Sequence, residues 1–179
     1  MNIALIGMRG AGKSKISRRL SALLKRDVLS SDLLISYDHG AKSIPEIVAE
    51  QGGDWRKFRD MEFATLQKIC ALDGNIIDCG GGIVVDLDNE GNEIFSDRKI
   101  ALLRENSKII WLKGDIKRLA QKVKDDPKRP SLSDTKSLED VMKRRMPFYK
   151  KAADIVINIE DKSKKDLCDE VMEAILQFL

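Results

Sequence analysis

The sequence predicts an α/β fold of three layers, in which a five-stranded parallel sheet lies between two layers of helices. Two observations lead to this prediction. Short runs of apolar residues alternate along the chain with longer segments whose apolar residues recur at helical spacing. A glycine-rich segment, residues 7–14, joins the first apolar run to the first helical segment. Strands separated by helical connections pair in parallel, because each connection returns the chain to the same end of the sheet.

The predicted strands are residues 3–6, 27–30, 75–78, 108–112 and 154–158. They are short and largely apolar rather than alternating, a pattern typical of strands that helices cover on both faces. The predicted helices include residues 14–25, 44–50, 55–72, 117–124, 137–151 and 165–178. Ser43 is expected to cap the second of these helices, because Pro45 stands in its first turn and Glu46 completes a capping box.

The segment Gly7–Ser14 fits the pattern G-x-x-x-x-G-K-[ST] and stands between a strand and a helix, which is the context that a P-loop requires. Its glycines allow the backbone to approach a polyphosphate, and the following helix offers unpaired N–H groups. Lys13 is expected to reach the β- and γ-phosphates and Ser14 to bind Mg²⁺. The sequence therefore predicts a P-loop NTPase fold, with a nucleotide site formed by Gly10, Ala11, Gly12, Lys13, Ser14 and Lys15.

The composition excludes several classes of partner. A net charge of +3 from 32 basic and 29 acidic residues is a mixed surface and not that of a nucleic-acid-binding protein. Three cysteines without C-x-x-C spacing argue against a zinc site. No apolar run approaches the roughly 20 residues of a membrane span, and no signal peptide is evident. We expect a cytoplasmic, monomeric protein with a single domain, residues 1–179, that binds neither nucleic acid nor membrane.

Polar residues and glycines follow the second and third predicted strands. Ligands of parallel sheets bind outside the carboxyl ends of the strands, so these residues should face the same crevice as the P-loop. Asp32 follows the second strand, and Asp78 and Gly80–Gly82 follow the third. The three glycines leave backbone N–H groups open to a small ligand. An alternative role for Asp32 is to cap a short helix over residues 33–37.

Residues 126–132, Asp-Pro-Lys-Arg-Pro-Ser-Leu, interrupt two helical segments, because prolines disfavour a continuous helix. We interpret residues 125–136 as a lid. Arg129 is then expected to close onto the phosphates and to neutralise charge in the transition state. The alternative is that Arg129 is an ordinary solvated arginine.

Taken together, these motifs resemble those of the shikimate kinase family. The matching segments are residues 43–47 (Ser-Ile-Pro-Glu-Ile), 58–62 (Phe-Arg-Asp-Met-Glu), 80–82 (Gly-Gly-Gly), 128–130 (Lys-Arg-Pro) and 145–149 (Arg-Met-Pro-Phe-Tyr). The resemblance runs from the P-loop to about residue 158. It implies a fold like that of nucleoside monophosphate kinases, and transfer of phosphate from ATP, with Mg²⁺, to the 3-hydroxyl of shikimate. The products would be shikimate 3-phosphate and ADP, in the biosynthesis of chorismate and aromatic amino acids.

The resemblance also implies a role for each site residue. Asp32 would contact the substrate hydroxyls, Arg59 and Arg145 would hold the substrate carboxylate, and Gly80–Gly82 would line the site. A helical region at about residues 32–62 would bind the substrate. Lys13, Asp32 and the lid residue Arg129 would be catalytic. These residue types suit the substrate, since shikimate carries a carboxylate, which arginine binds through two donors, and hydroxyls, which a carboxylate accepts.

The sequence departs from the family pattern at the metal site and in one connection. The family has Asp-Thr-Asp where this chain has Ser30-Ser31-Asp32, and Ser or Thr where it has Asp78. We hypothesise that Asp78 replaces the missing carboxylate and binds Mg²⁺ together with Ser14. The alternative is that Asp78 only caps the glycine turn. The longer acidic segment 86–93 is predicted to be a hairpin or loop rather than a calcium loop, because its flanks resemble strands.

Two other functions stay open from the residues alone. One is a P-loop kinase for another small molecule, such as gluconate or a nucleoside monophosphate. The second is a kinase-like domain that binds ligands without catalysis, suggested by the carboxylate missing at Ser30. The intact Lys13, Asp32 and paired arginines favour the shikimate-phosphorylating enzyme.

Overall fold

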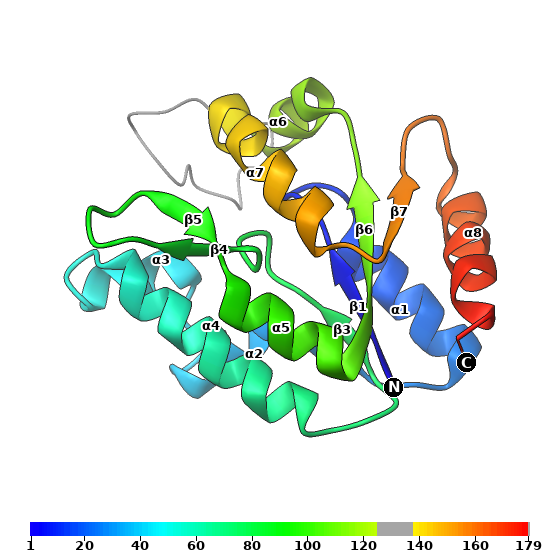
Figure 1. Ribbon diagram of the computed structural model, residues 1–179, viewed down its shortest axis with the longest axis horizontal. Helices are drawn as coiled ribbons and strands as arrows, with labels where there is room; N and C mark the ends of the chain where they lie inside the picture. The colour runs from blue at the N-terminus through cyan, green and yellow to red at the C-terminus, as the bar shows by residue number, and fades with distance from the viewer. Residues whose placement is uncertain (125–137, 179) are drawn as a thin grey trace.

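The computed structural model describes residues 1–124 and 138–178. Its centre is a five-stranded sheet with the strand order β2-β3-β1-β6-β7, in which every neighbouring pair is parallel (Figure 1). The strands are β1 (Asn2–Ile6), β2 (Val28–Ser30), β3 (Ile76–Asp78), β6 (Ser107–Lys113) and β7 (Ile155–Asn158). The predicted parallel sheet is confirmed, and each strand begins and ends within one residue of its predicted limits.

Helices cover both faces of this sheet, as predicted. They are α1 (Lys13–Leu24), α2 (Ser31–Asp38), α3 (Ile44–Glu50), α4 (Trp55–Cys70), α5 (Asp97–Asn106), α6 (Ile116–Lys124), α7 (Leu138–Ala152) and α8 (Lys164–Leu176). In Figure 1, α1 and α8 lie together on one side of the sheet, and α4 and α5 lie together on the other. The predicted capping box of Ser43 and Glu46 at the start of α3 is confirmed.

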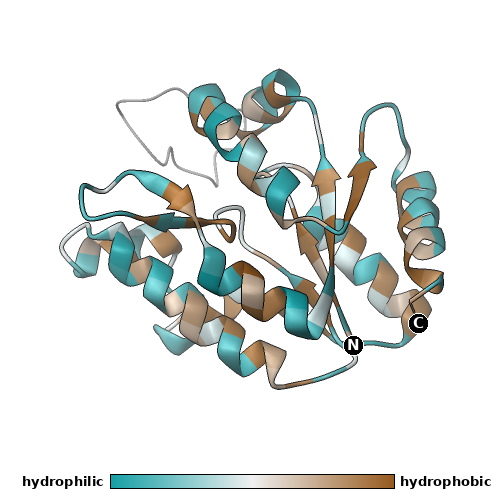
Figure 2. Ribbon diagram, viewed as in Figure 1, coloured by the Kyte–Doolittle hydropathy of each residue, from teal (hydrophilic) through white to brown (hydrophobic). Residues whose placement is uncertain are grey.

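The core lies between the sheet and these two helical layers. All five residues of β1 and all three of β3 are buried, and most of β6 is buried as well. Burial on both faces explains why these strands are continuously apolar instead of alternating. Figure 2 shows hydrophobic colour along the central strands, while hydrophilic colour lies mostly on the outer turns of the helices.

The acidic segment folds into a hairpin, and a further helix follows it. An antiparallel hairpin, β4 (Val85–Leu87) and β5 (Glu93–Phe95), occupies the acidic segment for which a hairpin or loop was expected. The helix α5 was not predicted. Lys99, Ile100 and Leu103 form its buried face, and a lysine among the buried positions weakens the apolar periodicity from which a helix is recognised.

The carboxyl ends of three adjacent strands bring the predicted site together. The P-loop follows β1, the segment Ser31-Asp32 follows β2, and Gly80–Gly82 follow β3. Asp78 lies opposite Leu5 of β1 and Ser30 of β2 in the sheet register. None of the helices within residues 1–124 and 138–178 is long and apolar enough to cross a membrane.

Candidate active site

A cleft of about 1270 Å³ opens at this edge of the sheet. The predicted residues that line it are Gly10, Gly12, Lys13, Ser14, Lys15, Asp32, Arg59, Asp78, Gly80, Gly81, Gly82 and Arg145. Ala11 is buried beneath the loop, and its backbone N–H donates to the carbonyl of Met8 at 3.2 Å. Arg129 and the whole of the predicted lid, residues 125–136, lie outside the described residues.

The P-loop passes directly into α1. Gly12 is the N-cap of this helix at φ +92°, a left-handed conformation that favours glycine. No side chain caps the helix, so its first N–H groups face the cleft. Lys13 Nζ donates to the carbonyls of Gly7 at 2.9 Å and Met8 at 3.3 Å, which holds the ammonium group over the loop. This arrangement suits a polyphosphate.

Asp32 lies in the first turn of α2, within the field of four other charged side chains. Burial raises the pKa of Asp32 to about 6, and the negative charges of Glu62 and Asp78 act in the same direction. The positive charges of Lys13 and Arg59 act against this rise. The charge of Asp32 therefore interacts with those of the P-loop lysine and of Arg59.

The main chain of the glycine segment touches two of the predicted substrate residues. A Cβ atom on Gly80 would lie 2.2 Å from Asp32 Oδ1, and one on Gly82 would lie 2.5 Å from Arg59 Nη1. A larger residue at either position would displace Asp32 or Arg59, because these side chains lie directly against the backbone. The Gly80 N–H also donates to Ser31 Oγ at 2.9 Å, so the start of α2 holds the segment in place.

Arg59 reaches the cleft from the second turn of α4. Its side chain is almost fully buried, with Nη1 donating to Glu62 Oε2 at 2.8 Å and to the Gly82 carbonyl at 3.5 Å. The guanidinium carbon lies 5.6 Å from the ring centroids of both Trp55 and Phe58. Within the described part of the chain, Arg59 Nε is buried and has no hydrogen-bond partner.

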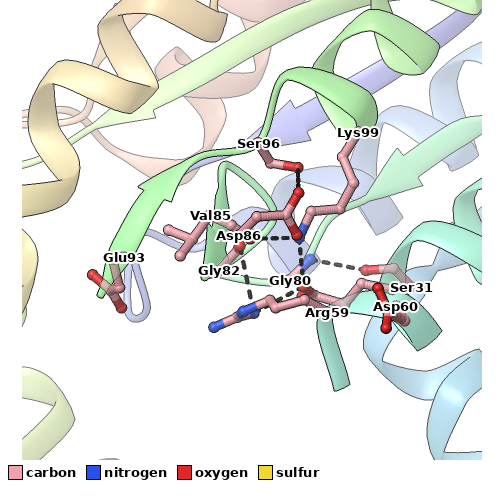
Figure 3. A network of polar contacts seen from close by, with 12 residues as sticks. Ser31, Arg59, Asp60, Gly80, Gly82, Val85, Asp86, Glu93, Ser96 and Lys99 are labelled. Carbon is pink, nitrogen blue, oxygen red and sulfur yellow. Dashed lines mark hydrogen bonds and ion pairs between the residues drawn. The ribbon is translucent and has the colours of Figure 1, made fainter. Parts of the chain in front are cut away.

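Behind Arg59, Glu62 accepts a second hydrogen bond from Lys99 of α5, at 2.8 Å. Lys99 Nζ also donates to the Val85 carbonyl at 2.6 Å and lies 3.7 Å from Asp86 Oδ1 (Figure 3). Burial by itself raises the pKa of Glu62, but the charges of Arg59 and Lys99 outweigh burial and lower it. Glu62 is therefore an anion held between two buried cations.

The acidic residues at the base of the hairpin complete this network. Asp86 accepts from Ser96 Oγ at 2.6 Å and from two nitrogens of Arg98, each at 2.9 Å. Arg98 also pairs with Asp60 of α4 at 2.8 Å. At the tip, Asp88 Oδ1 accepts the backbone N–H groups of residues 90 and 92. Asp86 thus ties the hairpin to Arg98 of α5, which is also paired with α4, and Asp88 fixes the tip.

Arg145 reaches the glycine segment from α7. Its Nη1 donates to the Gly81 carbonyl at 3.4 Å, and the Tyr149 hydroxyl donates to the same carbonyl. The Nε and Nη2 atoms of Arg145 both face Glu93 of β5. The two arginines therefore contact neighbouring carbonyls, those of Gly81 and Gly82.

Comparison with known proteins identifies the family of the chain. A family model described as shikimate kinase matches residues 9–178. The chain belongs to the shikimate kinase family. It is 42% identical to the shikimate kinase of Leptospira borgpetersenii over 97% of both chains. It is also 36% identical to that of Dehalococcoides mccartyi, over 99% of this chain and 94% of the relative. The enzyme therefore catalyses the ATP-dependent phosphorylation of shikimate.

Solved structures of the family share the fold. The shikimate kinase of Acinetobacter baumannii in complex with shikimate superposes with a TM-score of 0.82 at 27% identity, over 99% of this chain and 93% of that one. The shikimate kinase of Aquifex aeolicus gives a TM-score of 0.76 at 20% identity, over 99% and 98% of the two chains, and supports the fold alone. The predicted P-loop kinase fold and the predicted function are confirmed.

Sequence reasoning missed three residues of this site: Glu62, Glu93 and Lys99. Glu62 belongs to the motif at residues 58–62, and Glu93 belongs to the acidic segment. The sequence therefore singles out both segments, but it assigns neither glutamate a function. Lys99 gave none, because a lysine on a helix is ordinarily solvated. Only the contact of α5 with α4 reveals that it is buried.

Proposed function

We propose that ATP binds over the P-loop and that shikimate lies between the arginine pair and Asp32. The observation that carries this placement is the glycine segment itself. Its carbonyls at Gly81 and Gly82 face Arg145 and Arg59, and its backbone at Gly80 lies against Asp32. A ring held across these three glycines has its carboxylate at the cationic end and its hydroxyls at the anionic end.

Asp32 is proposed to accept the hydrogen bond of the attacking 3-hydroxyl and then its proton. With a pKa raised to about 6 by burial, Asp32 is mostly ionised at neutral pH and is a stronger base than a solvated aspartate. Phosphoryl transfer depends chiefly on positioning and on charge compensation, which Lys13 provides on the P-loop. Arg129 is proposed to add positive charge from the lid.

Mg²⁺ is the proposed cofactor, held by Ser14 and Asp78. Ser14 is exposed at the start of α1, Asp78 ends β3, and both side chains line the cleft. A hydroxyl and a carboxylate are oxygen donors, which Mg²⁺ prefers, and this metal takes its other ligands from phosphates and water. Among the described residues no cluster of three or more acidic, His or Cys side chains could hold a metal alone. This agrees with a Mg²⁺ ion that takes some of its ligands from the protein and the others from the nucleotide phosphates and water.

The test determines which compound accepts the phosphate and which arginines bind it. Purified enzyme is assayed for ATP consumption with shikimate, gluconate or a nucleoside monophosphate, and the phosphorylated carbon of the product is assigned by NMR. We expect turnover with shikimate and a 3-phosphate product. We expect Arg59→Ala and Arg145→Ala each to raise the KM for shikimate without raising the KM for ATP. Unchanged shikimate KM in both variants would refute the placement.

A further inference from the structure

The hairpin β4–β5 places a carboxylate on one of the two proposed substrate arginines. Glu93 contacts Arg145 Nε at 3.1 Å through Oε1 and at 3.2 Å through Oε2, and its Oε1 also accepts from Nη2. Arg144 Nε donates to Glu93 Oε2 at 3.1 Å. The side chains of Glu93 and Arg145 are each only 13% exposed.

We propose that Glu93 is a positioning residue, which fixes the guanidinium of Arg145 in the orientation that binds the substrate carboxylate. This inference rests on the placement of shikimate given above. It adds to that placement a residue that neither contacts the reacting atoms nor lies on the same helix as the arginine that it orients.

The edge of the guanidinium that Glu93 occupies supports a positioning role. Guanidinium presents its donors in a planar fork, so one carboxylate can take the Nε–Nη2 edge while a second takes the Nη1–Nη2 edge. Glu93 takes the first edge. Nη1 points to the Gly81 carbonyl in the cleft, so the second edge lies on the side of the glycine segment.

The other arginine has an equivalent partner. Arg59 is paired with Glu62, three residues later on the same helix. Arg145 has no acidic residue at positions 141, 142, 148 or 149 of its own helix, so its carboxylate must come from another element. Glu93 supplies it from β5. A cation buried near substrate needs such a partner, because an uncompensated buried charge is costly.

Contacts with α7 and α5 hold the hairpin in place, so that Glu93 can fix the orientation of Arg145. Phe95 of β5 packs edge-to-face on Phe148 of α7, with ring centroids 6.0 Å apart, and Lys151 Nζ lies 3.8 Å from the Phe95 centroid. At its base, Asp86 is bound by Ser96 and Arg98. Burial by itself raises the pKa of Glu93, but the hydrogen bonds and charges of Arg145 and Arg144 outweigh burial and lower it. Glu93 therefore stays ionised at neutral pH.

The opposite role is intramolecular competition, in which Glu93 would occupy Arg145 in place of the substrate carboxylate. The two roles predict opposite changes in the KM for shikimate when Glu93 is removed. Removing a competitor lowers the KM for shikimate, whereas removing a positioning carboxylate raises it. Steady-state kinetics of Glu93→Gln therefore decide between them, with Glu90→Gln as the matched control. Glu90 is exposed on the same hairpin, and its substitution makes the same change in charge.

We expect Glu93→Gln to raise the KM for shikimate about tenfold, the effect of losing one charge-assisted contact at a buried site. In Glu93→Gln, kcat and the KM for ATP should stay within about twofold of the parent values. The control Glu90→Gln should change none of these three constants. Glu93→Asp keeps the charge but shortens the reach, so it should give a smaller rise. It also provides a second test where the glutamine variant folds poorly.

The same substitution in an Arg145→Met background completes a double-mutant cycle. If Glu93 acts through Arg145, it should have no further effect on the shikimate KM there. An unchanged or lowered KM in Glu93→Gln, or an equal rise in the Arg145→Met background, would overturn the positioning role alone. If Arg145→Met itself leaves the shikimate KM unchanged, the proposed contact of Arg145 with shikimate fails, and the positioning role fails with it.

Discussion

Lys99 and Glu62 form an ion pair in the interior of the protein, with 2.8 Å between Nζ and Oε2 and side-chain exposures of 0% and 1%. The same carboxylate oxygen binds Arg59, so a lysine on α5 is connected to a proposed substrate residue on α4. The pair is surrounded by further contacts, because Lys99 also reaches the Val85 carbonyl and Asp86. The substrate end of the cleft therefore depends on a helix that does not line it.

Removing Lys99 should destabilise the protein strongly. We expect Lys99→Met to lower the free energy of unfolding by about 3–5 kcal/mol, the usual cost of leaving one partner of a buried ion pair uncompensated. Urea unfolding followed by circular dichroism measures this loss. Lys165→Met, a matched substitution at an exposed position of α8, should change stability by less than about 0.5 kcal/mol. Equal effects of the two substitutions would contradict the role assigned to Lys99.

The close approach of side chains to the glycine segment predicts graded costs for alanine. We expect Gly80→Ala and Gly82→Ala to lower the free energy of unfolding by about 1–3 kcal/mol, because Asp32 and Arg59 must move away from the new methyl group. Gly81→Ala should cost less, since its Cβ would meet Arg9 N at 3.4 Å. Denaturant unfolding of the three variants checks this order, and a larger cost at Gly81 would reverse it.

The raised pKa of Asp32 predicts a pH dependence of catalysis. The aspartate must be ionised to accept a hydrogen bond from the substrate hydroxyl. Hence kcat/KM for shikimate should fall as the pH decreases through about 6. Measurement from pH 5 to 8 at saturating ATP should show one protonation. Asp32→Asn should lose most of the activity and also this protonation step. A flat profile in the parent enzyme over that range would exclude Asp32 as the acceptor.

The same shift predicts that Asp32 reduces stability at neutral pH. A carboxyl whose pKa is raised on folding, here from 3.8 to about 6, favours the folded state only when protonated, and this advantage is lost as the pH rises through that interval. Relative to the parent, Asp32→Asn should therefore be more stable by about 1–3 kcal/mol at pH 8 and little changed near pH 4. Denaturant unfolding at both pH values measures the difference, and a gain confined to low pH would have the wrong sign.

The neighbouring strand ends β2 and β3 allow a direct test of the metal site. Asp78→Asn should raise the Mg²⁺ concentration that gives half-maximal activity, because one oxygen ligand or water acceptor is neutralised. Ser30 lies opposite Asp78 in the register, at the position where the family has aspartate. Adding Ser30→Asp to the Asp78→Asn variant should restore the Mg²⁺ response. Failure of both changes to affect that response would leave Asp78 with only a structural role.

The sequence by itself determined the sheet, most helices and the nucleotide loop. Each of these depends on local pattern: continuous apolar runs for strands buried on both faces, helical spacing, and a glycine motif between a strand and a helix. The order of the elements then placed Asp32, Asp78 and the glycines at one edge, because parallel strands share that edge. The resemblance of its motifs to one family added the substrate, which local pattern could not supply.

Only the tertiary structure decided how the substrate end is supported. Glu62, Lys99 and Glu93 are ordinary surface residue types, and no spacing in the chain links Arg59 to Lys99 or Arg145 to Glu93, which are 40 and 52 residues apart. Charged residues can be buried only where partners from other elements meet them, and those partners are chosen by the packing of α4, α5, α7 and the hairpin. Arg59 and Glu62 are neighbours on one helix, but the pairing of Glu62 with Lys99 and of Arg145 with Glu93 is a property of the folded chain.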